Sequence, residues 1–258
     1  MMRGVINMVS FLPMVYLVMM PLYLSHSTGL VACAGINVIV ADSSEHSFVT
    51  RDDVAGLFGE VAAEIAGRPV GSADLSSIKA KLALLPEIRR GEVYRTIDGK
   101  INVMVRQRMP VVRIVSPGGE SYYIDKEGVL LKKRGVSSPR VHIVTGNTGL
   151  NLDSFDGKNI TEHEESALLA DIYTLVSYIR SDPFLNALID QIEVDRRGDL
   201  QLIPRVAGQR ILFGGIENYR DKLANLDAFY EQVLPVAGWD IYPVIDVRFE
   251  GQVTARRR

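Results

Sequence analysis

Cysteine is almost missing from this 258-residue chain, which contains a single one, Cys33. One cysteine excludes an internal disulfide and a Cys/His metal cluster, so the stability of the chain must come from ordinary apolar cores. An excess of positive charge is also missing, because the formal net charge at pH 7 is −2. That balance gives no electrostatic argument for nucleic-acid binding. The composition therefore points away from disulfide-rich, zinc-binding and nucleic-acid-binding proteins.

The motifs of common catalytic sites are missing as well. The sequence has no His-x-x-x-His pair, no glycine-rich phosphate loop and no Gly-x-Ser-x-Gly elbow. His142 falls in an expected strand, and His163 lies among glutamates at an expected helix start. The carboxylates in Asp125-x-x-Gly128 and around Asp195 are typical of turns. We therefore expect no enzyme activity, no metal and no cofactor, and interpret the chain as a scaffold.

An uncharged apolar run at residues 4–24 is the most informative segment that the sequence does contain. A helix of that length rises about 1.5 Å per residue, which is enough to cross a hydrocarbon core of about 30 Å. Arg3 and the amino terminus are the cationic groups before the run, and the next cationic residue is Arg51. Because positive charge favours the cytoplasmic side, we expect residues 1–3 to be a cytoplasmic tail and everything after the span to lie on the far side of the membrane.

Two other interpretations of this leader stay open. Leu30-Val31-Ala32-Cys33 resembles a lipobox, at which cleavage would leave a lipidated Cys33. Ala32-Cys33-Ala34 also has the small-x-small form of an ordinary cleavage site. The apolar run is, however, longer than the usual signal core of about 7–15 residues. We therefore expect an uncleaved membrane anchor, followed by a linker at residues 25–34 in which Cys33 is a small linker residue.

Residues 35–109 show the pattern of one small α+β unit. We expect a strand at 36–40, a helix at about 51–58, a second helix ending at Pro86, and strands at 88–94 and 101–105. Thr50 and Asp53 are typical of a helix N-terminus, and Ser72 or Asp74 could cap the second helix. Asp98-Gly99 is a hairpin turn signal between the last two strands.

Pro110 begins a larger, β-rich region at residues 110–258. We expect strands at 111–115, 121–124, 129–131, 141–144, 189–194, 200–203, 210–213 and 244–249. Thr161 and Glu164 have the spacing of a capping box for a long helix with Leu168 on its inner face. A second helix is expected at about 216–233. Residues 252–256 are expected to extend the last strand past Gly251, which completes an α+β fold.

Three stretches carry a resemblance to a known family. They are Leu84-Leu85-Pro86 followed by Arg108-Met109-Pro110-Val111; Tyr123-Ile124-Asp125-x-x-Gly128-Val129; and Lys222-Leu223 with Leu226, followed by Ile245-Asp246-Val247-Arg248-Phe249. In their order along the chain they resemble the bacterial FtsQ/DivIB cell-division proteins. Cys33 before Gly-Ile-x-Val resembles the subgroup found in Bacteroidetes-type bacteria. One departure is Glu87-Ile88, where the family often has an apolar pair such as Trp-Val.

The resemblance implies a single-pass inner-membrane protein at the division septum, with a POTRA domain at 35–109 and a β domain at 110–258. It implies a non-catalytic scaffold that binds FtsB- and FtsL-like proteins and helps to recruit and regulate septal cell-wall synthesis. Other divisome components would bind the POTRA domain, at a sheet edge near 88–95 or 36–40. Two alternatives stay open, namely a POTRA-bearing envelope assembly or transport factor and a periplasmic lipoprotein of unknown activity.

The last strand is the expected binding site. A strand at the edge of a sheet exposes unpaired N–H and C=O groups, to which a partner segment can add itself as another strand. We expect Ile245, Val247 and Phe249 to pack on the helix at 216–233, and Arg248 to point away toward a partner carboxylate. A core strand with a solvated tail is the alternative for this segment. The candidate partner-binding residues are Arg248, Phe249, Gln252, Val253, Thr254, Ala255 and Arg256.

Overall fold

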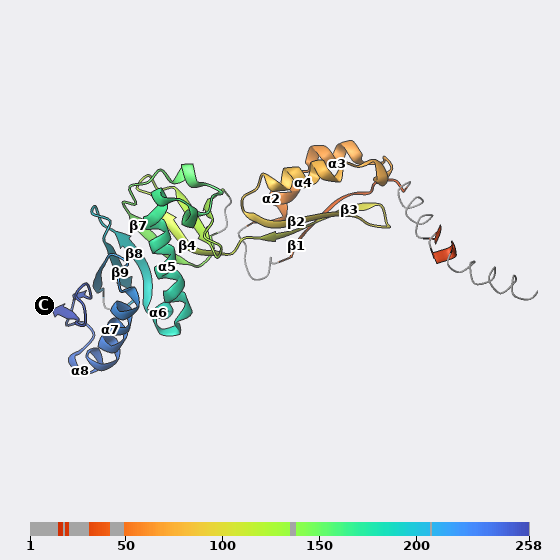
Figure 1. Cartoon of the computed structure of the whole chain (residues 1–258). Coiled ribbons are helices and arrows are strands. Elements are labelled where there is room, and N and C mark those ends of the chain that lie inside the picture. The colour runs from red at the N-terminus through yellow and green to blue at the C-terminus, as the bar shows by residue number, and fades with distance from the viewer. Residues whose placement is uncertain are drawn as a thin grey trace, which may run out of the picture. The chain divides into compact units, whose positions relative to one another are not determined.

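The computed structural model of the chain describes residues 15–17, 19–20, 31–41, 49–134, 138–206 and 208–257. They form two compact units, Met1–Gln107 and Arg108–Arg258 (Figure 1). Among these residues, no helix is both long and apolar enough to cross a membrane. The expected transmembrane helix at 4–24 lies mostly outside the described residues, so the membrane span stays a prediction.

The first unit is a three-stranded sheet with helices on one face (Figure 1). Its elements are β1 (Gly35–Val40), α2 (Arg51–Gly56), α3 (Gly59–Ile65), a 3₁₀ turn (Val70–Ser72), α4 (Leu75–Ala83), β2 (Ile88–Arg95) and β3 (Lys100–Gln107). The strand order is β1-β3-β2, with β1 parallel and β2 antiparallel to the central strand. Both β1 and β2 are therefore edge strands of the described sheet, in the two segments that were expected to offer an edge.

Local sequence signals explain most of this unit. The amide of Asp53 donates to the Thr50 hydroxyl at 3.2 Å, and the Thr50 amide donates back to the Asp53 carboxylate at 2.9 Å. This reciprocal pair is the expected start of α2. Asp74, and not Ser72, caps α4. Helix α3 was not expected, because no side chain caps it at Phe58 and so no start signal marks it in the sequence.

The second unit contains a mixed sheet of nine strands in the described chain, in the order β12-β11-β10-β9-β8-β7-β4-β5-β6. Its elements are β4 (Pro110–Val115), β5 (Ser121–Asp125), β6 (Leu130–Lys132), β7 (His142–Gly146), three 3₁₀ turns (Leu152–Phe155, Ile160–Glu162, Glu164–Ser166), α5 (Ala167–Ser181), α6 (Pro183–Leu188), β8 (Ile189–Val194), β9 (Leu200–Pro204), β10 (Arg210–Gly214), α7 (Tyr219–Gln232), α8 (Leu234–Ala237), β11 (Val244–Asp246) and β12 (Thr254–Arg256).

The core of this unit lies between the sheet and its two long helices. Burial recurs along α5 at the period of a helix with one buried face, at Leu169, Ile172, Leu175, Val176 and Ile179. Leu168, expected on that face, is only partly buried, and Leu169 takes the inward position. Burial at this period confirms that α5 packs its apolar stripe against the sheet.

The expected capping box at Thr161 and Glu164 is wrong. Thr161 lies in a 3₁₀ turn capped by Asn159, whose side-chain oxygen accepts the Thr161 amide at 2.9 Å. The long helix begins later, at Ala167. The hydroxyl of the preceding residue, Ser166, donates to the Ile160 carbonyl at 2.6 Å and so ties the helix start to the turn. A tertiary contact therefore positions this helix start, which a spacing rule does not detect.

The helix breaker at Ser181-Asp182-Pro183 does end α5, but a second helix starts at once. The Asp182 carboxylate accepts the amides of Phe184 and Leu185, both at 2.9 Å, and Pro183 occupies the first turn of α6. Asp182 is thus both the end of one helix and the cap of the next. The helix expected at 216–233 is shorter, Tyr219–Gln232, and its buried aromatic pair is Phe229 and Tyr230.

Candidate functional site

The C-terminal strand is shorter than the sequence indicates, and the chain then reverses. β11 covers only Val244–Asp246, whereas a strand to Phe249 was expected. Gly251, with a φ of 68°, lies in the turn that follows. The expectation that residues 252–256 extend this strand is wrong, because they return beside it as the antiparallel strand β12. A glycine adopts a left-handed backbone at little cost, which allows the chain to fold back here.

The register of β12 fixes the faces of the candidate residues. Thr254 lies opposite Asp246, Ala255 opposite Ile245, and Arg256 opposite Val244. Ala255 and Val253 are partly buried against the core cluster that contains Ile245. Thr254 and Arg256, like Gln252, are exposed. The terminal segment is therefore a half-buried strand whose alternate side chains face solvent.

The backbone groups of β12 can be assigned from the neighbouring ladder. The Arg210 amide donates to the Pro243 carbonyl at 2.9 Å, and the Val247 amide donates to the Leu212 carbonyl at 3.0 Å. Because backbone groups alternate sides along a strand, Val244 and Asp246 direct theirs toward β12. Their β12 partners are Arg256 and Thr254, so the N–H and C=O of Ala255 point away from β11.

The two edges of the large sheet differ in whether other segments of the chain cover them. On the β6 side, the Leu130 amide donates to the Lys158 carbonyl at 3.0 Å, and the Leu130 carbonyl accepts the Gly157 amide at 2.8 Å. The Lys132 amide also donates to the Asp156 carboxylate at 2.8 Å. The chain thus covers that edge itself. No strand of the described chain lies on the outer side of β12. An uncovered edge of this kind can accept an added strand.

Arg248 forms an ion pair within the chain. Its Nε donates to Asp246 Oδ1 at 2.9 Å, and its Nη2 donates to Oδ2 at 2.6 Å. Burial raises the pKa of Asp246, but the side-chain and backbone hydrogen bonds of Arg248 outweigh that effect and lower the pKa below its usual value. The guanidinium therefore already has a carboxylate partner inside the chain, and its expected contact with a partner carboxylate stays a prediction.

The apolar residues of the same stretch divide into two groups. Ile245 and Val247 are 0% and 1% exposed and belong to the core cluster, as expected. Phe249 is 49% exposed, so its expected packing on the long helix is wrong. The chain has left the strand before Phe249, and alternation no longer sets its direction. Its ring centroid lies 6.0 Å from the Arg248 guanidinium carbon.

A shallow hollow accompanies this edge. It has a volume of about 290 Å³ and lies across β10, β11 and β12. Its lining residues are Leu212, Val244, Asp246, Thr254, Ala255 and Arg256. Apolar and charged side chains thus meet beside an uncovered strand edge, which offers both backbone bonds and side-chain contacts to an added strand.

The carboxylates that could suggest catalysis are turn formers. Asp125 accepts the amides of Glu127 and Val129, at 2.9 and 2.8 Å. Asp195 likewise accepts the amides of Arg197 and Asp199. Across the described ranges, no group of three or more His, Cys, Asp or Glu side chains could hold a metal ion. The fold and this edge define a two-unit α+β protein with a surface suited to binding another polypeptide.

Comparison with known proteins agrees with this class. A family model described as FtsQ/DivIB, C-terminal related, matches residues 109–256, and a POTRA-like domain model matches residues 31–106. The cell division protein FtsQ of Rhodothermus marinus is 27% identical over 205 residues, which cover 78% of this chain and 72% of that protein. The chain belongs to the FtsQ/DivIB, C-terminal related family, a family of cell-division proteins. The resemblance drawn from the sequence and the expected order of a POTRA-like and a β-rich α+β domain are confirmed.

Two features were not expected from the sequence. The return strand β12 had a signal, because Gly251 stands between the apolar stretch at 244–249 and a second alternating segment. Cys33 had none. It is 5% exposed, and its amide donates to the Arg68 carbonyl at 2.7 Å, so it is packed in the first unit and is not a linker residue.

Proposed function

We propose that the chain is a bitopic, non-catalytic scaffold of the bacterial divisome that binds FtsB- and FtsL-type proteins. Binding would help to recruit and regulate septal cell-wall synthesis. The proposal places a cytoplasmic tail at residues 1–3 and a transmembrane helix at 4–24, followed by a linker that begins at residue 25 and ends before the packed residue Cys33. The POTRA domain at 35–109 and the β domain at 110–258 would then be periplasmic. Membership of the FtsQ/DivIB-related family and the R. marinus relative support this assignment.

Strand addition at β12 is the proposed mode of binding. The observation that carries it is the uncovered outer side of β12, in contrast to the β6 side that residues 156–159 cover. A partner strand would bond to the outward N–H and C=O of Ala255 and would place side chains beside Thr254 and Arg256. Each backbone hydrogen bond contributes about 0.5–1.5 kcal/mol net. Several such bonds, with side-chain contacts in the hollow, would give a stable complex.

Other divisome components would bind the POTRA-like unit at the outer side of β1 or β2, the two edges of its sheet. The protein would act in the inner membrane at the septum. No nucleic acid, metal or cofactor takes part in this proposal.

A proline at position 255 tests the mode of binding. Ala255→Pro removes the outward N–H but no bond to β11, and proline is tolerated on the solvent side of an edge strand. Ala255→Val keeps that N–H and is the matched control. With the full-length chain in detergent, we expect the proline variant to bind FtsB- and FtsL-type partners at least about tenfold more weakly, the equivalent of about 1.4 kcal/mol. Equal binding by the two variants would rule out strand addition at this edge.

Localisation tests the wider assignment. A fluorescent fusion of the full chain should form a band at midcell in dividing cells. A uniform rim around the cell would contradict the divisome role, whatever the outcome of the proline experiment.

A further inference from the structure

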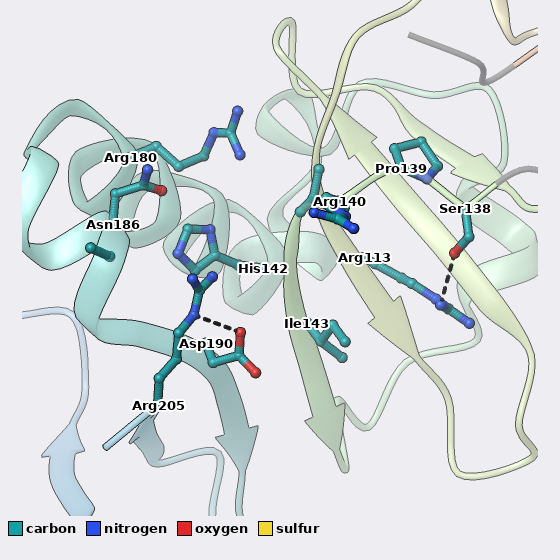
Figure 2. Close-up of a pocket in the computed structure, with 12 residues that line it drawn as sticks. Arg113, Ser138, Pro139, Arg140, His142, Ile143, Arg180, Asn186, Asp190 and Arg205 are labelled. Carbon is teal, nitrogen blue, oxygen red and sulfur yellow. Dashed lines mark hydrogen bonds and ion pairs between the residues drawn. The ribbon is translucent and has the colours of Figure 1, made fainter.

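A basic groove lies at the ends of strands β8 and β9 that are farthest from the turn that connects them. It has a volume of about 750 Å³, and four arginines line it, namely Arg113, Arg140, Arg180 and Arg205. They come from β4, the segment before β7, the end of α5 and the residue after β9 (Figure 2). The groove lies on strands near the middle of the sheet, whereas β12 is the terminal strand of that sheet. The groove and the β12 edge are therefore separate sites.

Positive charge in this groove exceeds the negative charge that faces it. Asp190 is the carboxylate in the lining, and it pairs with Arg205 Nε at 3.0 Å. Arg113 donates to the hydroxyls of Ser121 and Ser138, which are uncharged. No described carboxylate forms an ion pair with Arg113, and none does with Arg140 or Arg180. Three guanidinium charges therefore remain without a counter-charge, in a chain whose net charge is −2.

A buried histidine in the same recess lacks a well-formed hydrogen bond. His142 is 5% exposed, and neither of its ring nitrogens makes a hydrogen bond of good geometry within the described chain; the nearby Ile189 backbone contributes only a weak interaction. In Figure 2 its ring lies in the recess with the side chains of Arg180 and Arg205. Burial lowers the pKa of His142, and Arg180 and Arg205 lower it further, against weaker opposing effects of Asp190 and the Ile189 backbone. Buried polar groups without partners are rare in native proteins, and a missing ligand is one physical explanation.

We propose that this groove binds an acidic polypeptide segment, whose carboxylates pair with Arg113, Arg140 and Arg180. The guanidinium fork matches a carboxylate in a bidentate pair, and it holds a charge at every physiological pH. The recess is open to solvent, and its arginines come from separate elements, which suits several carboxylates spaced along an extended chain. A single phosphate ion would leave most of a groove of this volume empty.

Binding of a defined peptide to the full-length chain tests the proposal. The probe is a fluorescein-labelled hexapeptide of alternating Glu and Ser, and its matched control replaces every Glu with Gln. Fluorescence anisotropy in detergent at low salt should show binding of the Glu peptide and none of the Gln peptide. Because exposed charges are screened within about 10 Å at 0.1 M salt, the affinity should fall as salt is added. Equal binding of both peptides would overturn the proposal.

Variants locate the binding. Arg140 and Arg180 are exposed, so replacing them with Gln should leave the fold intact. Arg140→Gln with Arg180→Gln should weaken binding at least tenfold, while Arg196→Gln, an exposed arginine in the β8–β9 turn, should change it less than twofold. Equal losses in the two proteins would show binding to surface charge in general and overturn the proposal. Full displacement of the peptide by 1 mM inorganic phosphate would assign the groove to a small anion and overturn it too.

The pH dependence gives a readout that surface charge alone does not. A carboxylate bound beside His142 favours the protonated ring, so binding takes up a proton and should strengthen between pH 7.5 and pH 5.5. The Glu side chains of the probe stay mostly ionised over that range, because their ordinary pKa is about 4.3. His142→Gln should abolish the difference between the two pH values. A difference that persists in His142→Gln would remove the histidine from the site.

Discussion

Asp246 accepts both arms of the Arg248 guanidinium, at 2.9 and 2.6 Å, and also accepts the Arg248 amide at 3.1 Å. The pair joins the last residue of β11 to the segment that leaves the sheet. It holds the chain in the path that leads through Gly251 into β12. The contact between Asp246 and Arg248 thus helps to build the edge at which we propose that a partner binds.

Breaking this pair should weaken the fold at its C-terminal edge. Arg248→Gln leaves a partly buried carboxylate without its charged partner, and we expect a loss of about 1–3 kcal/mol in the free energy of unfolding. Asp246→Asn combined with Arg248→Gln should cost less than the sum of the two single changes, because both groups are removed together. Urea unfolding of the four proteins measures the coupling. Strict additivity would show that the pair contributes nothing.

The same pair makes stability depend on pH in a defined direction. The folded pKa of Asp246 lies below its ordinary value, so the stabilisation is present above the unfolded pKa of about 3.9. It is lost as pH falls through the lower folded pKa. The stability difference between the native chain and Arg248→Gln should therefore shrink between pH 7 and pH 3. Urea midpoints at both pH values check this, and a difference that grows toward low pH would contradict it.

Gly146 should tolerate no side chain. Its φ is 100°, and a Cβ there would overlap the Val194 carbonyl oxygen in the neighbouring strand β8. Gly149 has a φ of 67°, and a Cβ there would meet no atom within 4 Å. Gly149→Ala therefore adds only backbone strain, which costs about 1–2 kcal/mol. Gly146→Ala should cost clearly more, since β7 and β8 must separate as well. Thermal unfolding compares the two variants, and equal losses would show that the close approach is absent.

Cys33 should react slowly with thiol reagents in the native chain. Its side chain is buried and its amide is bonded to Arg68, so a maleimide reaches the sulfur only when this segment opens. Labelling should be complete in denaturant and slow without it. Mass spectrometry of the whole protein measures the extent of labelling over time. The intact mass from the same spectrum shows whether the amino-terminal segment is still attached. A chain that begins at a lipidated Cys33 would contradict the expected uncleaved anchor.

Local signals in the sequence determined much of the fold. Thr50 and Asp53 specify the start of α2 by themselves, because a cap needs only side chains within one turn of helix. Asp125 and Gly128 specify the β5–β6 turn in the same way: the carboxylate binds two nearby amides and the glycine adopts a φ of 78°. Periodic burial along α5 likewise depends on spacing within a single element.

Tertiary contacts decided what local rules did not detect. The start of α5 depends on the Ser166 hydroxyl reaching Ile160, and the burial of Cys33 depends on Arg68, which lies far along the chain. The direction of Arg248 follows from the bend after Asp246, since alternation along a strand stops where the strand stops. The basic groove gathers arginines from four separate segments, which no linear pattern links.

The sequence alone therefore determined the family resemblance, the division into a POTRA-like and a β-rich α+β unit, and the segment that forms the C-terminal edge. Periodicity, caps and turns act over a few residues and are readable in one dimension. The tertiary structure decided that β12 folds back as the terminal strand, that Ala255 directs its backbone outward, and that Arg248 is paired. Those outcomes depend on which strand lies beside which, and strand pairing joins residues whose separation along the chain carries no signal.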